Sequence, residues 1–235
     1  MRGRSYLMRI VVRLFLACLL ADLSLAAFAN GGGEKPMPSM PMPRVETPQQ
    51  KARDAYNDGV RSVKKADKAQ QAAAEATDAG KKDKAVHEAH DAYAAALVKF
   101  TDATGLDPTL HEAWNYVGYC NRKLGNYDDA LAAYDKALAI KPGYPDALEY
   151  RGEAYLGLGR VPEAQQAYLD LYAGNRALAG KLLSAMKSWA TAQRASPSGP
   201  STTNLDELDK WIQERTQIAS QTAALTRAGT AASWR

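Results

Sequence analysis

The chain has 235 residues, of which 24% are charged, and a formal net charge of +4. Positions 1–29 hold four of the 30 basic residues but only one of the 26 acidic residues, so the remainder has 26 basic and 25 acidic residues, a net charge of +1. This balance argues against a globally basic nucleic-acid-binding protein. The chain is rich in Ala, Leu, Lys, Glu and Gln and poor in Phe, Ile and Val, which favours one domain made of helices.

Residues 1–29 have the pattern of a cleavable secretory signal peptide. Four arginines precede an apolar stretch at 14–20 that resumes at Leu23, and positions 27–29 (Ala-Phe-Ala) form a small-x-small cleavage site. An acidic residue interrupts the apolar run, which falls short of the ~20 residues that a membrane-spanning helix needs. We therefore expect cleavage before Asn30 and a periplasmic protein, and not a retained membrane anchor.

The two cysteines have different expected fates. Cys18 lies inside the signal peptide, where acylation as in a lipoprotein is an alternative, although the apolar stretch before it is short. Cys120 is then alone, so the mature chain cannot form an intramolecular disulfide. Its place beside a helix-packing position predicts a buried thiol that packs as a small apolar side chain and is not reactive.

Residues 30–46 form a linker that is rich in Gly and then in Pro and Met, without helical periodicity. Met37, Met40 and Met42 bring three thioethers together, and thioethers are soft ligands that suit Cu(I). No His or Cys stands near them. A spacer in which the methionines are incidental is the alternative to a copper site.

A helical hairpin is predicted over residues 47–108. Thr47 suits the N-cap position and Pro48 the first helical position, while Gly80 and the polar residues 81–84 indicate a break between two helices. Apolar residues recur with helical spacing on each helix. They are Ala52, Tyr56, Val60, Val63 and Ala66 on the first, and Val86, Ala89, Tyr93, Ala96, Leu97, Phe100 and Ala103 on the second.

The chain then repeats itself every 34 residues. The matched positions are Ala96, Ala130 and Ala164; Phe100, Tyr134 and Tyr168; Pro108 and Pro142; Trp114 and Leu148; Gly118 and Gly152; and Gly125 and Gly159. The small residues allow paired helices to approach, and the aromatic residues fill the space between neighbouring pairs. Gly125 and Gly159 stand where a helix must stop and turn, a place that favours positive φ.

Residues 114–142 read Trp-x3-Gly-x6-Gly-x-Tyr-x2-Ala-x3-Tyr-x2-Ala-x4-Pro. This stretch resembles the tetratricopeptide repeat (TPR) at nearly every diagnostic position. Together with the signal-like N-terminus, the chain resembles a TPR protein of the exported bacterial periplasmic type. The next unit, 148–171, keeps most of the pattern, but Leu171 replaces a small residue and Arg176 the proline, which fits a terminal repeat. The resemblance implies an all-α solenoid of helical hairpins, with repeats at 109–142 and 143–176.

The first hairpin is longer than a repeat. If Gly59 corresponds to Gly118, then 37 residues separate Gly59 from Ala96 where 12 separate Gly118 from Ala130. The extra residues would lengthen each helix by about 12 residues, or roughly 18 Å. We expect a projecting antiparallel arm; an unstructured insertion rich in Ala and Lys is the alternative.

The C-terminal part is predicted to hold two more helices. A capping helix at 177–194 would cover the apolar flank of the last repeat. Residues 195–203 are a linker, and 204–235 form an amphipathic helix and tail that either packs on the solenoid or stays free of it. The expected apolar stripes are Leu178, Leu182, Met186 and Trp189 on the first helix, and Leu208, Trp211, Ile212 and Ile218 on the second.

No pattern of residues predicts catalysis or a cofactor. The chain has no Gly-x-Ser-x-Gly elbow and no Gly-rich phosphate loop. His87 and His90 lie three residues apart on a helix without further ligands at metal spacing, so we interpret them as part of a solvated surface. We therefore expect a protein that is not an enzyme and that has no metal site of this kind.

In TPR folds the first helices of successive repeats line a concave groove, and the resemblance places eight residues there. They are Glu112, Asn115, Tyr119, Arg122, Lys123, Asp146, Glu149 and Glu153. Asn, Arg and Lys at such positions can clamp a peptide carboxylate; a merely solvated face is the alternative. The leading hypothesis is an adaptor or scaffold that binds a protein or peptide partner. A copper-handling accessory protein and a non-catalytic subunit of an envelope enzyme complex are the alternatives.

Overall fold

The computed structural model describes residues 46–196 and 202–232. Within these residues the chain forms helices and no strands, as predicted. The helices are α1 (Pro48–Glu75), α2 (Ala79–Leu106), α3 (His111–Lys123), α4 (Tyr127–Ile140), α5 (Pro145–Gly157), α6 (Val161–Gly174), α7 (Arg176–Arg194) and α8 (Thr202–Ala232). The predicted signal peptide, most of the Met- and Pro-rich linker and most of the linker before α8 lie outside the described residues.

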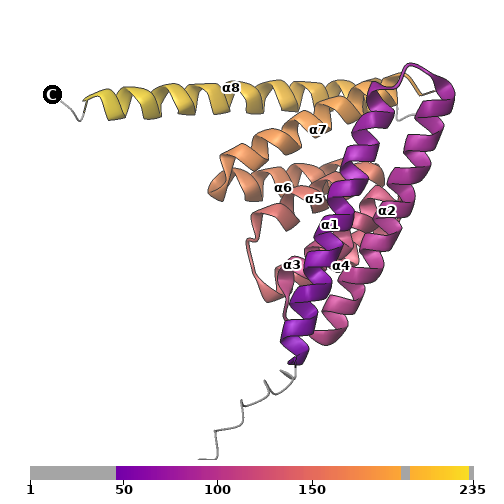
Figure 1. Cartoon of the computed structure of the whole chain (residues 1–235). Coiled ribbons are helices and arrows are strands. Elements are labelled where there is room, and N and C mark those ends of the chain that lie inside the picture. The colour runs from indigo at the N-terminus through magenta and orange to yellow at the C-terminus, as the bar shows by residue number, and fades with distance from the viewer. Residues whose placement is uncertain (1–45, 197–201, 233–235) are drawn as a thin grey trace, which may run out of the picture. The chain divides into compact units, whose positions relative to one another are not determined.

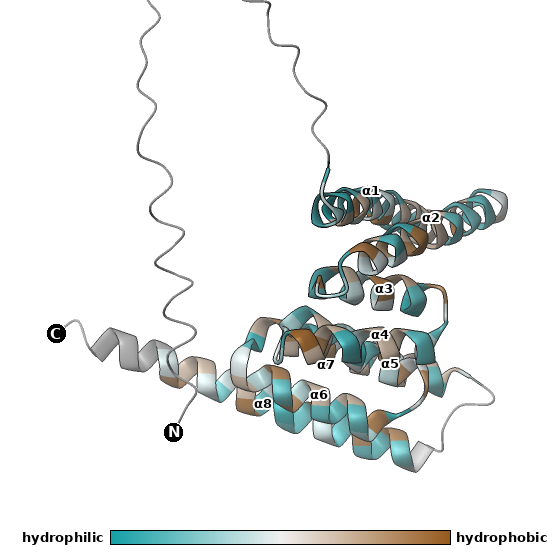
Figure 2. Ribbon diagram, turned by 90° about the horizontal axis from the view of Figure 1, so that it is seen from below, coloured by the Kyte–Doolittle hydropathy of each residue, from teal (hydrophilic) through white to brown (hydrophobic). Residues whose placement is uncertain are grey.

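The helices pack as hairpins that follow one another along a solenoid, so the predicted fold class is confirmed. α1 pairs with α2, α3 with α4 and α5 with α6, and each hairpin contacts the next through α2–α3 and α4–α5 (Figure 1). α7 packs against both α5 and α6, and α8 against α7. The ribbon coloured by hydropathy has hydrophobic segments on helices that face a neighbouring helix, as in α2 and α3 (Figure 2). None of the described helices combines the length and the apolar character needed to cross a membrane.

The first hairpin is an ordered, elongated arm, which rules out the unstructured insertion. α1 and α2 have 28 residues each, whereas α3 has 13 and α4 has 14. α1 begins as predicted, because the Thr47 hydroxyl accepts a hydrogen bond from the backbone N–H of Gln50 at 3.2 Å.

Two expectations for this hairpin are wrong. The break was expected at Gly80, but α1 ends at Glu75 and α2 already begins at Ala79, because the Asp78 carboxylate caps α2 by accepting the Lys81 backbone N–H at 2.9 Å. Val86 was expected in the apolar stripe but is 49% exposed, since buried alanines pack this end of the arm. These alanines are Ala66, Ala69, Ala73, Ala89 and Ala92.

The packing confirms that Gly59 corresponds to Gly118 and that Phe100 corresponds to Tyr134. A Cβ added to Gly59 would lie 2.7 Å from the Phe100 ring, and one added to Gly118 would lie 2.5 Å from the Tyr134 ring. The two hairpins therefore share the same close contact between a glycine and an aromatic ring. At Gly152 the nearest side chain is instead Leu182 of the capping helix α7, at 2.5 Å, so the α5–α6 hairpin does not repeat this contact.

The turn glycines also behave as predicted. Gly125 has φ +84° and Gly159 has φ +70°, both in the left-handed region that favours glycine. The small residues Ala96, Ala130 and Ala164 are fully buried.

The C-terminal helices pack on the solenoid. α7 caps the last repeat with fully buried Leu182 and Met186. α8 begins at Thr202, slightly earlier than predicted, and buries Leu205, Leu208 and Ile212 in one cluster with α6 and α7. Ile218 was expected in the buried stripe but is 40% exposed, so the apolar contact of α8 weakens along its length.

Candidate partner-binding face

The first helices of the hairpins bring a row of tyrosines together. Tyr56 of α1 lies 5.7 Å from Tyr116 of α3, and Tyr116 lies 6.1 Å from Tyr119, measured between ring centroids. Tyr119 in turn lies 5.1 Å from Tyr150 of α5. All four rings are partly exposed. We call these four tyrosines, together with the eight residues predicted from the TPR resemblance, the tyrosine face.

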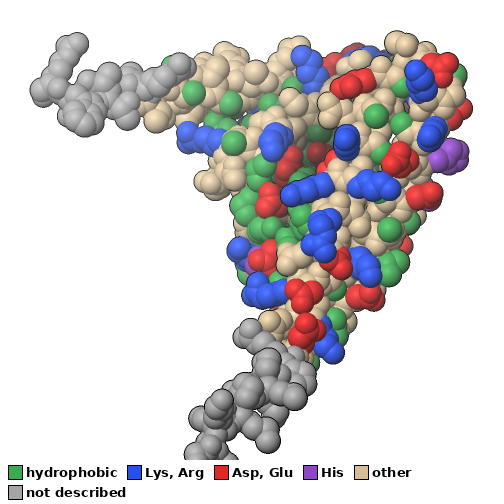
Figure 3. Space-filling model, in the orientation of Figure 1, with side chains coloured by type: hydrophobic (Ala, Val, Ile, Leu, Met, Phe, Trp, Pro, Cys, Tyr) green, Lys and Arg blue, Asp and Glu red, His purple; other side chains and the backbone are tan. Residues whose placement is uncertain are grey.

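Helical spacing explains why α3 and α5 supply this face. Residues three or four positions apart share one side of a helix. Glu112, Tyr116 and Tyr119 therefore lie in one stripe of α3, and Asp146 and Tyr150 lie in one stripe of α5. Figure 3 shows hydrophobic side chains with acidic ones among them beside the basic surface of α1.

The elongated arm is bonded to this face. The Asp67 carboxylate of α1 accepts hydrogen bonds from the hydroxyls of Tyr93, at 2.6 Å, and of Tyr119, at 2.8 Å. Lys123 donates to the side-chain oxygen of Gln70 at 2.7 Å. Burial raises the pKa of Tyr119, and the neighbouring Tyr93 and Asp67 add to the effect. The arm thus holds two of the predicted groove residues in place.

Arg122 is engaged inside the protein. Its guanidinium forms an ion pair with Glu153, and only 12% of its side chain is exposed. It also lies over the rings of Tyr119 and Tyr150, at 5.3 and 5.4 Å from their centroids, within the range of cation–π attraction. The structure therefore brings together Arg122 and Glu153, which the sequence placed in different repeats.

Two of the eight predicted residues lie deeper than a solvated groove position. Asn115 is 2% exposed, and its Oδ1 has no hydrogen-bond partner. Glu149 is 4% exposed, and burial raises its pKa, with the charge of Glu153 adding to the rise. The merely solvated face is therefore wrong for these two positions. Whether the eight residues bind a partner stays a prediction.

Residues 111–144 and 133–166 each match a family model described as the tetratricopeptide repeat. Together with the hairpin packing, these matches decide what the repeated unit is. Residues 111–166 are tetratricopeptide repeats. All eight predicted groove residues lie within the matched residues 111–166. Tyr56 and Asp67 of the arm lie outside them.

This chain is similar to parts of two longer proteins. It is 34% identical over 103 residues to the Hsp70-Hsp90 organizing protein of Triticum aestivum. It is 32% identical over 109 residues to the heat shock protein sti1 homolog of Schizosaccharomyces pombe. The matches cover 43% and 46% of this chain but only 18% of each relative, so the chain spans less than a fifth of the length of these relatives.

A small cavity of about 200 Å³ continues the tyrosine face toward α7. The ion pair of Arg122 and Glu153 forms one side of it, and Leu156, Ala185 and Trp189 line the other. Sequence reasoning did not find this cavity, although Trp189 was recognised as part of the stripe of the capping helix.

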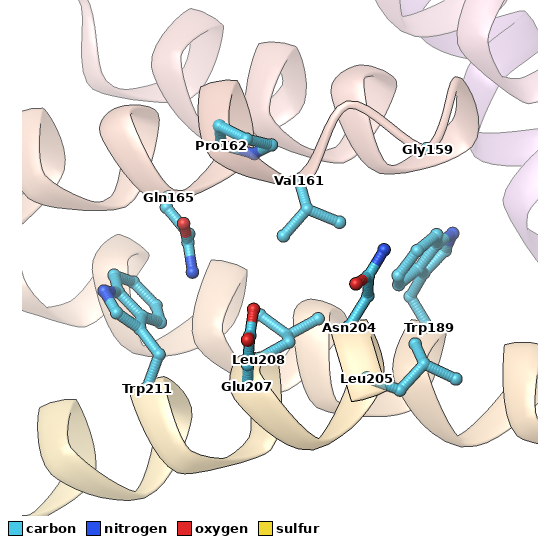
Figure 4. A pocket seen from close by; sticks show the side chains of 10 residues that line it. All are labelled: Gly159, Val161, Pro162, Gln165, Trp189, Asn204, Leu205, Glu207, Leu208 and Trp211. Carbon is cyan, nitrogen blue, oxygen red and sulfur yellow. The ribbon is translucent and has the colours of Figure 1, made fainter. Parts of the chain in front are cut away.

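A second cavity, of about 530 Å³, lies between α8 and the start of α6. Trp211 and Trp189 stand at its two ends, with Val161 and Leu208 between them (Figure 4). The apolar stripe of α8 was the signal for packing here, but it did not predict a cavity. Among the described residues no group of His, Cys, Asp and Glu is arranged to hold a metal ion.

Proposed function

We propose that this chain is an exported TPR adaptor, which holds a protein or peptide partner on the tyrosine face and carries out no chemistry itself. The observation that supports this most is the row of four partly exposed tyrosines across α1, α3 and α5, set among charged residues. Tyrosine supplies a large, rigid contact area at little cost in side-chain entropy, and it is enriched where proteins bind one another.

The relatives agree with a binding role. One relative is named for the organisation of Hsp70 and Hsp90, and the other is named as a heat shock protein homolog. The identity of the partner does not follow from that similarity, because the chain corresponds to a small part of either relative.

Export is the second part of the proposal, and it rests on the signal-like pattern of residues 1–29. N-terminal sequencing of the protein from the cell that produces it should begin at Asn30. An intact N-terminus on protein recovered from the cytosol would contradict export and would leave the binding role untouched.

Affinity capture with a tagged full chain tests the binding role. The variant Glu112→Arg with Asp146→Arg places two bulky side chains on the tyrosine face at positions where no Lys or Arg pairs with the carboxylate in the described structure. We expect this variant to lose the partner that the wild type captures.

The matched control is Glu75→Arg with Asp102→Arg. It makes the same charge change on exposed positions of α1 and α2 away from the tyrosine face, and it should retain the partner. Equal capture by the two variants would place the interface elsewhere. Arg122 is a poor choice for this test, because removing it would leave Glu153 without its ion-pair partner.

A further inference from the structure

Three carboxylates of the tyrosine face have no Lys or Arg as an ion-pair partner within the described structure. They are Glu112, in the first turn of α3, Asp146, in the first turn of α5, and Glu149, one turn further on. The ion pair that Glu112 forms is with the imidazole of His111, at 3.0 Å. Glu112 and Asp146 are therefore open to pairing with a cation from outside the chain, whereas the charges of Lys181 and Arg122 already favour the ionised form of Glu149.

Aromatic rings surround the same carboxylates. Tyr116 follows Glu112 by one turn, and Tyr150 follows Asp146 by one turn. Burial raises the pKa of Tyr56 to about 12, and the charges of Glu112 and Asp146 add to this rise. The faces of tyrosine rings attract cations within about 6 Å of the centroid. Carboxylates and tyrosines together thus make this part of the face selective for positive charge.

Asn115 gives an independent indication of the same kind. It shares the stripe of α3 with Glu112 and Tyr119, and its buried Oδ1 lacks a hydrogen-bond donor. A buried acceptor without a partner carries a free-energy penalty that a donor group of a ligand would remove. The carboxylates and the Asn115 oxygen accept hydrogen bonds, and a Lys or Arg side chain only donates them.

The cations of the face are already used inside the protein. Arg122 pairs with Glu153, and Lys123 donates to Gln70. A partner with an acidic segment would therefore have to compete with these internal contacts.

We propose that the tyrosine face takes a basic segment of its partner, with a Lys or Arg side chain held by Glu112 and Asp146 and against the tyrosine rings. This inference rests on the proposed function, since it names the chemistry of the partner that the same face would bind.

Selection from a phage library of random decapeptides tests the inference with the full chain as bait. We expect wild-type protein to enrich peptides that contain Lys or Arg. The variant Glu112→Gln with Asp146→Asn should lose this enrichment and bind the best selected peptide roughly tenfold more weakly. The control Glu75→Gln with Asp102→Asn makes the same change in net charge elsewhere and should bind that peptide as the wild type does.

The outcomes separate the inference from the proposed function. Enrichment of acidic peptides, or of peptides without basic residues, would overturn the inference while the binding role stands. If the wild type enriches no peptide at all, both the peptide-binding role and the inference fail. Equal weakening by the two double variants would show that net charge, and not this site, attracts the peptide.

Asn115→Leu gives a second readout that a purely structural role would not produce. Leucine has the same number of side-chain heavy atoms and the same branching as asparagine, and it removes the unpaired buried oxygen, so the denaturation midpoint should stay the same or rise. Affinity for the selected basic peptide should nevertheless fall severalfold. Unchanged peptide affinity, or a loss of stability that accounts for the weaker binding, would contradict the role proposed for Asn115.

Discussion

The hairpins α1–α2 and α3–α4 share their central packing and differ in length. In both, a glycine of the first helix lies against an aromatic ring of the second, Gly59 against Phe100 and Gly118 against Tyr134. The α3–α4 hairpin turns within two helical turns of this contact, whereas α1–α2 continues with small buried alanines. The extension then reaches over α3 through Asp67 and Gln70. The difference shows that a repeat core can be kept while helix length is changed, and that the added length contacts the candidate binding face.

Cys120 lies where the two hairpins pack together. The rate at which its thiol is alkylated should show the largest effect. The thiol is fully buried in a cluster with Val63 and Phe100 of the arm and Ala133 of α4. Burial raises its pKa to about 12, and the charge of Asp67 adds to the rise. In the unfolded chain a thiol titrates near 8.5, so alkylation by iodoacetamide at pH 8.5 should be about a thousandfold slower in the native protein.

The sign of the pH dependence follows from the same shift. Because the folded pKa is the higher one, the contribution of this thiol to stability is fully present below the unfolded pKa. It is lost as the pH rises from there toward 12. Rapid labelling of the native protein, with no sign of unfolding, would mean that the two hairpins separate.

The shared glycine contact predicts equal penalties in the two hairpins. Gly59→Ala and Gly118→Ala should each destabilise the protein, because overpacking costs about 1–3 kcal/mol and helix propensity returns up to about 1 kcal/mol. Urea denaturation of both variants measures this. Gly180→Ala in α7 is the control, since a Cβ there meets nothing within 4 Å, and it should stabilise the protein slightly. A Gly118→Ala variant as stable as Gly180→Ala would contradict the shared register.

The polar links between the arm and α3 predict a smaller, local effect. Asp67→Ala removes the acceptor of the Tyr93 and Tyr119 hydroxyls and should cost about 1–2 kcal/mol. Asp67→Asn keeps an acceptor and should cost less. Amide hydrogen exchange should show faster opening of the distal half of α1 in Asp67→Ala. Exchange indistinguishable from the wild type would show that the links do not hold the arm.

The smallest change in the free energy of unfolding is expected at exposed positions away from the contacts between hairpins. Lys187→Ala on α7 and Val86→Gln near the end of the arm should change stability by no more than about 0.5 kcal/mol, because both side chains are exposed. A large loss of stability in Val86→Gln would mean that the end of the arm has packing contacts beyond its alanines.

The geometry of the repeat could be predicted because the same residue types recur at a fixed spacing. Glycine at 118, alanine at 130 and tyrosine at 134 have one joint role in helix packing, and Gly125 needs positive φ, so the register follows from sequence alone. The break between the two helices of the arm was predicted at Gly80, because glycine disfavours a helix. The structure places it before Ala79, because the Asp78 side chain is a strong N-cap.

The pairing across the candidate site could not be predicted in the same way. Asp67 and Tyr119 are 52 residues apart, and Gln70 and Lys123 are 53 apart, separations that the 34-residue repeat does not relate. The resemblance named groove positions, but it did not give their depth. The burial of Glu149 depends on how closely the neighbouring helices and tyrosines approach, which is a tertiary property.

Site-specific photocrosslinking in the producing cell tests the central claim most directly, namely that the tyrosine face is the binding surface. A photoreactive residue placed at Glu112, Lys123 or Asp146 should yield one crosslinked product that contains the same partner. The exposed positions Lys99 on α2 and Leu169 on α6 should yield none. Crosslinks from Leu169, or from Glu207 beside the cavity of α8, together with none from the tyrosine face, would contradict the account.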